Sequence, residues 1–281
     1  MGNAEKSACF AIVRTAARLI QRSGRQVAAD EITARLARIK CPALPSVAEL
    51  AREVDLLLVF GGDGTLLHTA RQMAGSKTPL LGVNIGGLGF LTAVPSDQLA
   101  PALKCVWRGE FQYEPRALIE AHGSGRGKPI RATALTAIVI SRGAVSRLIT
   151  LDVTVNGDLI TRYRCDGLIV SSPTGSTAYS LAAGGAVVLP TADVFVLTPI
   201  CPHALSNRSI ILPLSATIGV KAITTLPTAY LNADGQIAGE LGDGDEVTIR
   251  RSRSSVRLVH LKNSSFLEVL RRKLQWRGTY F

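Results

Sequence analysis

The first 113 residues alternate between short apolar runs and amphipathic stretches, a pattern that predicts an α/β domain. Strands are expected at residues 10–13, 26–29, 56–60 and 79–85. Helices are expected at residues 15–22, 46–52, 65–74 and 96–108. This order predicts a parallel sheet with helices on both faces, and such sheets bind ligands at the carboxyl ends of their strands.

From about residue 114 the apolar period changes to two, which predicts a β-rich second domain built as a sandwich. Its strands are expected at residues 117–121, 133–141, 148–155, 159–163, 167–171, 194–197, 217–221 and 246–250. The pair Asn156-Gly157 predicts a type I′ hairpin turn, and the Gly/Lys/Arg-rich residues 122–131 predict an exposed turn. We expect a first domain of residues 1–113, rejoined by a C-terminal helix in residues 264–281, and a second domain of residues 114–263.

A glycine-rich turn follows the apolar run 56–60 and precedes a helical pattern. Its sequence is Gly61-Gly62-Asp63-Gly64-Thr65. Glycines let the backbone approach a ligand closely, and the free N–H groups of a helix start favour an anion. A carboxylate would repel a phosphate there unless it binds a metal or takes a proton from an attacking hydroxyl. The alternative is an ordinary strand–turn–helix in which Asp63 caps the helix.

A second dense motif lies in residues 164–185, where a strand leads into a hydroxyl-rich loop and a short helix ended by two glycines. Hydroxyls and free N–H groups at a helix start suit ribose and phosphate, and Tyr179 offers a flat face on which a base can stack. The alternative is a structural loop, but such a loop needs fewer polar groups. We therefore expect a ligand here.

Composition narrows the class of protein. The 281 residues are 47% hydrophobic and 19% charged, as in globular soluble proteins, and no apolar run approaches the ~20 residues of a membrane span. Five scattered cysteines without a C-x-x-C pair argue against a zinc site and a disulfide framework, and for a reducing, cytoplasmic location. Residues 1–29 hold one acid and helically spaced arginines, as a transit peptide does, but a first strand and an amphipathic helix explain the same residues.

The net charge of +11 is concentrated near the C-terminus. Residues 250–281 contain nine Lys or Arg and one acid, Glu268. Aromatic side chains are not interleaved with these cations, and the segment has the pattern of a strand followed by a helix. We therefore expect a solvated basic face rather than a nucleic-acid site.

Taken together, the motifs resemble the bacterial NAD kinase family (ATP/polyphosphate–NAD kinases). The turn at residues 61–65 is shared with diacylglycerol and sphingosine kinases, but its combination with the motifs at residues 82–92, 166–179 and 197–206 is specific. The resemblance implies phosphoryl transfer from ATP, or polyphosphate, to the 2′-hydroxyl of the adenosine ribose of NAD, with Mg²⁺ carried by the nucleotide. It also implies a homodimer or homotetramer with the NAD site near a subunit interface.

By this resemblance Asp63 is the catalytic base, and Gly61, Gly62 and Gly64 lie against phosphates. Thr177, Ala178 and Tyr179 hold the adenosine. The other substrate-binding positions that the resemblance implies are His68, Asn84, Phe90, Thr136, Ala137, Arg147, Arg164, Asp166, Ser180, Ala182 and Gln236.

Two features depart from the family pattern. Thr136-Ala137 stands where the family has Asn followed by an acid, and each lost hydrogen bond to a buried ligand costs ~1–3 kcal/mol. The link between Val13 and Ala17 is shorter than the family's loop. A dinucleotide-binding protein with little turnover is therefore an alternative to the kinase. A lipid-kinase relative is a third possibility, against which the nucleotide-type loop at residues 171–185 counts.

Overall fold

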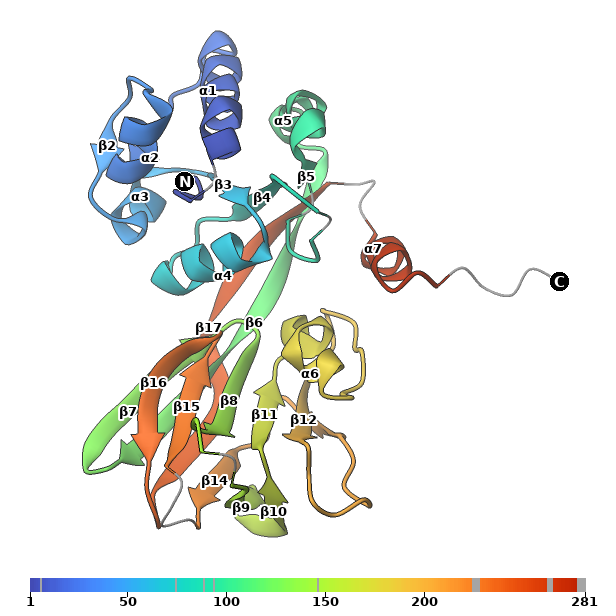
Figure 1. Ribbon diagram of the computed structural model, residues 1–281. Helices are drawn as coiled ribbons and strands as arrows, with labels where there is room; N and C mark the ends of the chain where they lie inside the picture. The colour runs from blue at the N-terminus through green and yellow to red at the C-terminus, as the bar shows by residue number, and fades with distance from the viewer. Residues whose placement is uncertain are drawn as a thin grey trace, which may run out of the picture. The chain divides into compact units, whose positions relative to one another are not determined.

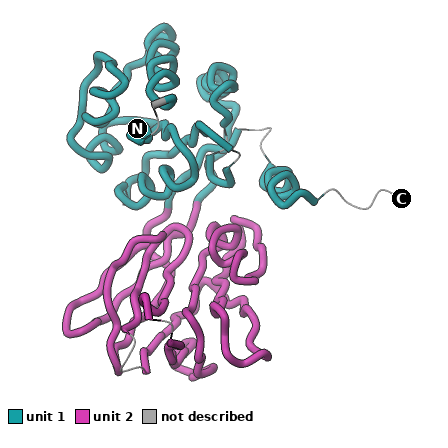
Figure 2. The backbone as a smooth tube through the Cα atoms, in the orientation of Figure 1, with its two compact units in different colours: residues 1–115, 256–281 teal, residues 116–255 magenta. Residues whose placement is uncertain are grey.

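The computed structural model describes residues 1–5, 7–73, 75–87, 89–92, 94–145, 147–223, 228–261 and 265–276. The chain divides into two compact units, shown in different colours in Figure 2. Unit 1 comprises residues 1–115 and 256–281, and unit 2 comprises residues 116–255. The chain passes from one unit to the other within two long strands, β6 (Phe111–Gly125) and β17 (Glu246–Leu261).

Unit 1 is an α/β unit with a parallel sheet. Its strands β3 (Leu57–Gly61), β4 (Leu80–Asn84) and β5 (Val94–Pro95) are neighbours and parallel, and the last part of β17 also pairs parallel with β4. Because Gly61 is paired with Asn84, the carboxyl ends of β3 and β4 lie side by side. This sheet edge is where a ligand site is expected.

Helices cover both faces of this sheet (Figure 1). The helices of unit 1 are α1 (Ser7–Arg22), α2 (Glu31–Ala37), α3 (Val47–Glu53), α4 (Asp63–Gln72), α5 (Leu99–Trp107) and α7 (Phe266–Lys273), with a 3-10 turn η1 (Ser96–Gln98). Phe60, Leu81 and Val83 form a buried core with α1 and α5. On the opposite face Leu66 of α4 lies against Gly82, where an added Cβ would come within 2.8 Å of Leu66 Cδ1. In the described ranges, no helix is both long and apolar enough to cross a membrane.

The strand predicted at residues 10–13 is wrong, because these residues lie inside α1. Cys9, Val13 and Ala16 are buried at helical spacing, so the same apolar residues serve a helix. The position beside β3 is taken by the N-terminus instead, where Gly2 forms a parallel bridge with Phe60. The link at residues 13–17, expected to be shorter than the family's loop, lies inside α1.

The strand predicted at residues 26–29 is also displaced. A strand of two residues, β1 (Ala29–Asp30), pairs parallel with β2 (Ala43–Leu44) in a small separate sheet. Asp30 then caps α2, with its side chain accepting a hydrogen bond from the backbone N–H of Thr33.

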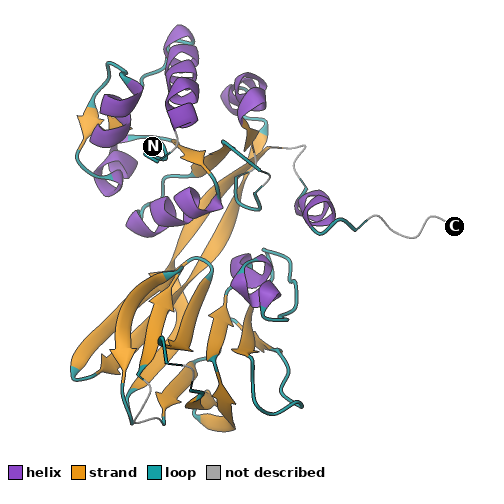
Figure 3. Ribbon diagram, viewed as in Figure 1, coloured by secondary structure: helices purple, strands orange, loops and turns teal. Residues whose placement is uncertain are grey.

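Unit 2 is an antiparallel β sandwich (Figure 3). One sheet contains β10-β9-β14-β17 together with β6 and β7, and the other has the order β13-β12-β11-β8-β15-β16. The strand bounds are β7 (Lys128–Ala134), β8 (Ala137–Arg142), β9 (Ile149–Val155), β10 (Asp158–Cys165), β11 (Gly167–Ser171), β12 (Val194–Ile200), β13 (Ile210–Pro213), β14 (Ile218–Ala222), β15 (Ala229–Ala233) and β16 (Gln236–Leu241). Both sheets contribute to one core, for example Leu151 and Val220 from the first and Ile138 and Phe195 from the second.

Two predictions for unit 2 need correction. The strand predicted at residues 133–141 is interrupted at Leu135-Thr136, which separates β7 from β8. The exposed turn predicted at residues 122–131 is mostly the β6–β7 hairpin, and only Arg126 and Gly127 form its turn, with φ of 46° and 73°. Between β9 and β10, residues 156 and 157 have φ of 53° and 94°, which confirms the predicted turn.

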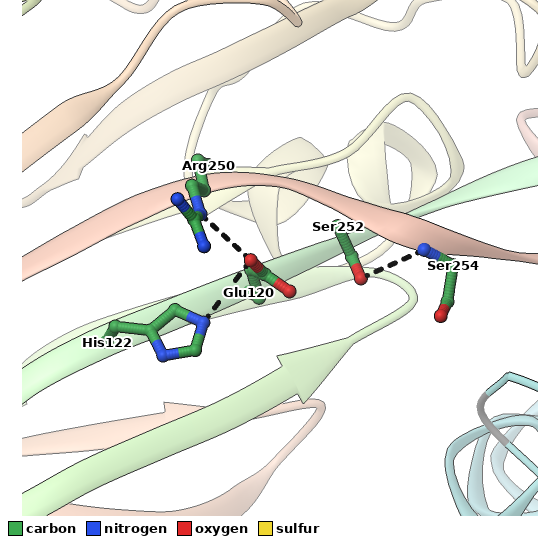
Figure 4. Close-up of polar contacts among 5 residues, drawn as sticks. All are labelled: Glu120, His122, Arg250, Ser252 and Ser254. Atoms are coloured by element: carbon green, nitrogen blue, oxygen red, sulfur yellow. Dashed lines mark hydrogen bonds and ion pairs between the residues drawn. The ribbon is translucent and has the colours of Figure 1, made fainter.

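A polar cluster joins β6 to β17 in unit 2 (Figure 4). Glu120 accepts a hydrogen bond from Arg250 Nε at 2.8 Å and lies 3.3 Å from His122 Nε2. Burial alone would raise the pKa of Glu120, but the hydrogen bonds from Arg250, Ser252 and His122 outweigh it and lower that pKa.

Candidate active site

Asp63 is the first residue of α4, directly after the helix cap Gly62. Its Oδ2 accepts a hydrogen bond from the backbone N–H of Phe90 at 2.7 Å. Its Oδ1 accepts hydrogen bonds from the backbone N–H of Leu91 and from both the N–H and the hydroxyl of Thr92, each at 3.1 Å. The carboxylate therefore holds the loop after β4 against the start of α4.

Asn84, at the end of β4, extends this network. Its amide Nδ2 donates to Thr92 Oγ1 at 2.9 Å and to the carbonyl oxygen of Gly87 at 2.7 Å. Asn84 is 6% exposed, and its Oδ1 has no hydrogen-bond partner among the described residues. A buried acceptor without a donor is costly, so this oxygen is suited to a donor on a ligand.

The glycines around Asp63 fall into two groups. An added Cβ at Gly61 would lie 2.3 Å from Thr65 Oγ1, and one at Gly89 would lie 2.2 Å from Asp63 Oδ1, so packing excludes side chains there. At Gly62 and Gly64 nothing lies within 4 Å of an added Cβ, and neither has a positive φ. The fold of unit 1 does not itself require these two glycines, and the space beside them is open to a ligand.

The same turn offers few free oxygens to a protein-held metal ion. Asp63 Oδ1 accepts three hydrogen bonds and Oδ2 accepts one, whereas Mg²⁺ is held by several oxygen ligands that are free to coordinate it. Over the ranges that the structure describes, His, Cys, Asp and Glu side chains form no group of three placed to hold a metal. Among the described residues of unit 1, the turn at residues 61–65 therefore offers backbone N–H groups and open space beside Gly62 and Gly64.

In unit 2 the hydroxyl-rich loop after β11 folds into η2 (Thr174–Thr177) and α6 (Tyr179–Ala182). Most of its hydroxyls form hydrogen bonds within the loop or to neighbouring strands and connections of unit 2, contrary to our expectation that they face a ligand. Ser172 Oγ donates to the carbonyl oxygen of Leu135 at 2.6 Å, and Ser180 Oγ lies 3.1 Å from Thr198 Oγ1. Ser171, Ser172, Ser176 and Ser180 are all fully buried. The polar residues are needed because this loop runs inside the unit.

What the loop presents outward is Tyr179, together with Ala178 and Ala182. Tyr179 is 51% exposed. Gly175 anchors the loop to the start of β8, since an added Cβ there would lie 2.2 Å from the carbonyl oxygen of Thr136. The exposed ring and the 136–137 segment therefore belong to one region of unit 2.

Asp234, which the sequence did not single out, holds the segment that contains Thr136 and Ala137. Its carboxylate accepts hydrogen bonds from the backbone N–H groups of Leu135 and Thr136, both at 2.8 Å, and of Ala137 at 3.3 Å. It also accepts a hydrogen bond from the hydroxyl group of Thr136. Asp234 lies in the β15–β16 turn, where an Asp-Gly pair is an ordinary turn signal, so nothing in the sequence linked it to Thr136.

Comparison with known proteins identifies the family. A model of the ATP-NAD kinase N-terminal domain matches residues 5–111, and a model of the ATP-NAD kinase C-terminal domain matches residues 135–261. This chain belongs to the ATP-NAD kinase family. The resemblance drawn from the motifs is thereby confirmed.

Individual ATP-NAD kinase relatives agree with the family models. The NAD kinase of Geobacter metallireducens is 42% identical over 230 residues, which is 81% of each chain, and that of Magnetococcus marinus is 38% identical over 263 residues, which is 92% of this chain and 87% of the relative. The crystal structure of yeast NADH kinase complexed with NADH matches with a TM-score of 0.90 at 26% identity, over 100% of this chain and 88% of that chain. An NAD kinase from Archaeoglobus fulgidus in complex with ATP matches with a TM-score of 0.74 at 27% identity, over 95% of each chain.

The structure brings the expected ATP-NAD kinase site residues together in three groups. Gly61, Gly62, Asp63, Gly64, Asn84 and Phe90 form the group at the sheet edge of unit 1, with His68 exposed one turn further along α4. Thr136, Ala137, Thr177, Ala178, Tyr179, Ser180 and Ala182 form the group at one end of β8 and β11, with Gln236 exposed at the start of β16.

The third group lies at the opposite end of the same strands. Asp166 precedes β11 and forms an ion pair with Arg142 Nε at 2.6 Å, while Arg164 and Arg147 are exposed. Because β11 separates Asp166 from the Tyr179 loop by a strand of five residues, the two groups lie ~15 Å or more apart. Within one chain, Arg164 and Asp166 are therefore remote from the 136–137 segment.

Proposed function

We propose that this protein transfers the terminal phosphoryl group of ATP, or of polyphosphate, to the 2′-hydroxyl of the adenosine ribose of NAD, which gives NADP. The observation that carries the proposal is the setting of Asp63, a carboxylate at a helix start between two glycines whose surroundings are open. A ligand phosphate can approach such a backbone, and a carboxylate beside it can receive a proton.

In the proposed step the ribose 2′-oxygen forms a bond to the terminal phosphorus of the donor. The bond from that phosphorus to the leaving oxygen of ADP, or of the shortened polyphosphate, breaks. The hydroxyl proton passes to Asp63. Oδ1 already accepts three hydrogen bonds and Oδ2 accepts one, so Oδ2 has the lone pair that faces the proton.

The donor phosphates would lie on the N–H groups at the start of α4, beside Gly62 and Gly64. α4 has ten residues, enough for its dipole to favour an anion at this end. We propose that Mg²⁺ arrives on the donor phosphates, since the described residues include no group of three His, Cys, Asp or Glu side chains placed to hold a metal ion. The ion would neutralise phosphate charge, and the residues of the chain would position the two substrates.

NAD would be held by the Tyr179 region of unit 2. Stacking of the adenine on the exposed ring of Tyr179 is worth ~1–3 kcal/mol, and Thr136 would contact the ribose side. The Thr136 hydroxyl donates its hydrogen bond to Asp234, so toward a ligand it can only accept a hydrogen bond. We therefore expect weaker NAD binding than an Asn at this position would give.

We also propose a homo-oligomer in which Arg164 and Asp166 of one protomer serve the NAD of another. Their distance from the Tyr179 region within one chain supports this arrangement. Exposed apolar residues on the edge strand β13, Ile210 and Ile211, supply a surface of the kind that oligomers bury. A cytoplasmic location remains a prediction from the cysteine content.

The test is to incubate the purified protein with NAD, ATP and Mg²⁺ and to quantify NADP, with the Asp63→Asn variant as the control. We expect NADP from the wild type and a loss of about a hundredfold or more in the variant, in the range general-base catalysis supplies. A wild type that forms no more NADP than the variant would contradict the proposal. If that protein still bound NAD, it would be a dinucleotide-binding protein instead.

A further inference from the structure

The basic helix α7 contacts the loop that holds Asp63. α7 belongs to unit 1, drawn in teal in Figure 2, and its last turn contains Arg271, Arg272 and Lys273. The Phe266 ring lies with its centroid 6.0 Å from that of Phe90, at a tilt of 40°. The Lys273 Nζ lies over the face of the same Phe90 ring, 4.6 Å from its centroid.

These two contacts come from one face of the helix. Phe266 and Lys273 are seven residues apart, which is close to two helical turns. α7 therefore contacts the Phe90 ring with an aromatic side chain from its first turn and a cation from its last turn. Tilted aromatic pairs and cations over a ring face are both attractive arrangements.

Phe90 also contacts the Asp63 carboxylate, through its backbone. Its backbone N–H donates to Asp63 Oδ2 at 2.7 Å, and Leu91 and Thr92, the next two residues, donate to Oδ1. Gly89, just before Phe90, leaves no room for a side chain beside Asp63. A shift of Phe90 that includes its backbone would therefore move the N–H that faces the oxygen proposed to take the proton.

We propose that α7 is a positioning element for Asp63, with Phe266 and Lys273 acting through Phe90. The inference rests on the proposed function and assigns a role to the basic C-terminal segment. Catalysis is sensitive to the placement of reacting groups on a scale below 1 Å, so a looser Phe90 lowers the rate of transfer more than the affinity for NAD.

A simpler role for the same residues is electrostatic steering of anionic substrates. Steering depends on the number of charges on α7 and weakens with salt, whereas positioning depends on which residue lies on the ring. Arg272 is exposed in the same turn and supplies the same charge, so it is the matched control for Lys273.

The first test compares Lys273→Met with Arg272→Met, using NAD and Mg-ATP. We expect Lys273→Met to lower kcat about three- to fivefold, the size of one exposed cation–π contact, with KM for NAD within about twofold. Arg272→Met should keep kcat within about 1.5-fold of wild type, and Lys273→Arg should restore it. In a Phe90→Leu background, Lys273→Met should have no further effect on kcat, because the ring through which it acts is gone.

Amide hydrogen exchange gives a second readout that needs no turnover. Exchange at residues 90–92 should be faster in Phe266→Ala and Lys273→Met than in wild type, and unchanged in Arg272→Met. Equal kinetic losses in Lys273→Met and Arg272→Met, or unchanged exchange at residues 90–92 in Phe266→Ala, would overturn the inference. A wild type that forms no NADP would overturn the proposed function instead, and exchange would still decide whether α7 holds the loop.

Discussion

Each unit of this molecule contains an aspartate that holds a neighbouring loop in the same way. Asp63 in unit 1 accepts hydrogen bonds from three consecutive backbone N–H groups and a threonine hydroxyl, at residues 90–92. Asp234 in unit 2 accepts the same set of donors, at residues 135–137. In both, one oxygen accepts three of the four hydrogen bonds.

The surroundings of the two carboxylates differ. Asp63 stands at the start of a ten-residue helix, next to two glycines with open space around them. Asp234 stands in a tight turn between antiparallel strands, with positive φ at Asp234 and at Gly235. Backbone N–H groups around a carboxylate therefore indicate a structural role. The open helix start is what distinguishes Asp63, for which we propose a catalytic role, from Asp234.

The largest expected difference between the two aspartates comes from replacing each of them, in separate variants, with asparagine. Each change turns an amide N–H₂ toward existing donors, so both variants should lose ~1–3 kcal/mol of unfolding free energy. Only Asp63→Asn should abolish the chemistry, with kcat lower by about 10²–10⁴. Asp234→Asn should keep kcat within about threefold and raise the KM for NAD about tenfold, because the Thr136 segment loosens. Equal losses of kcat in the two variants, measured alongside urea unfolding, would show that both aspartates are only structural.

A second prediction concerns the open glycines. Gly64→Ala lies inside α4, where alanine is a better helix former, so the free energy of unfolding should rise by ~0.5–1 kcal/mol. Turnover should fall about tenfold or more, because the new methyl group occupies the space proposed for the phosphates. Gly89→Ala is the contrasting variant, which should lose stability and turnover together. A Gly64→Ala protein with unchanged turnover would mean that phosphate does not approach this turn.

A third prediction sharpens the role of Asp234. Thr136→Asn supplies two amide N–H groups, so one can satisfy Asp234 while the other, with the amide oxygen, can face NAD. One added hydrogen bond should lower the KM for NAD about tenfold, whereas Thr136→Val should raise it. Steady-state kinetics at saturating ATP measures both. If neither variant altered the KM, the 136–137 segment would not contact NAD.

The smallest expected effect comes from Glu120, a carboxylate held by side chains rather than by backbone N–H groups. Its pKa in the folded protein is below the ordinary value of 4.5, so the ionised form adds stability above about pH 4.5. That contribution is lost as the pH falls through the lowered pKa. Because Arg250 is 57% exposed, the contribution of ionised Glu120 to the free energy of unfolding should be ~1 kcal/mol or less.

Urea unfolding of wild type and Glu120→Gln between pH 3 and pH 7 measures this contribution, with the exposed Asp243→Asn as the control. The stability curves of wild type and Glu120→Gln should converge at low pH and be fully separated above about pH 4.5. Parallel curves over the whole range would show that the cluster in Figure 4 adds nothing to stability.

The fold class followed from hydrophobic periodicity and is confirmed, because most elements are locally consistent. β3, α4 and β4 begin and end within two residues of their predicted bounds, and all three carry strong apolar or helical patterns. The strand expected at residues 10–13 failed because four apolar residues fit either period, and the place beside β3 was already filled by Gly2.

The site was predictable only in part, since its geometry depends on contacts between distant residues. Asp63 and Tyr179 stood out through local motifs, and the structure leaves both in settings open to a ligand. The pairing of Asp234 with Thr136 joins residues 98 positions apart, and α7 meets Phe90 across most of the chain. The inward direction of the Ser172 and Ser180 hydroxyls likewise depended on where β8 and β12 lie.

The central claim is that the Asp63 carboxylate takes part in the transfer of the phosphoryl group, and a single-turnover measurement tests it most directly. The Asp63→Asn protein is saturated with NAD, mixed rapidly with Mg-ATP, and NADP is quantified over time, while the Kd for NAD is measured by calorimetry on the same preparation. The account predicts a transfer rate lower by about a hundredfold or more and a Kd within about threefold of wild type. A transfer rate within tenfold of wild type would contradict it.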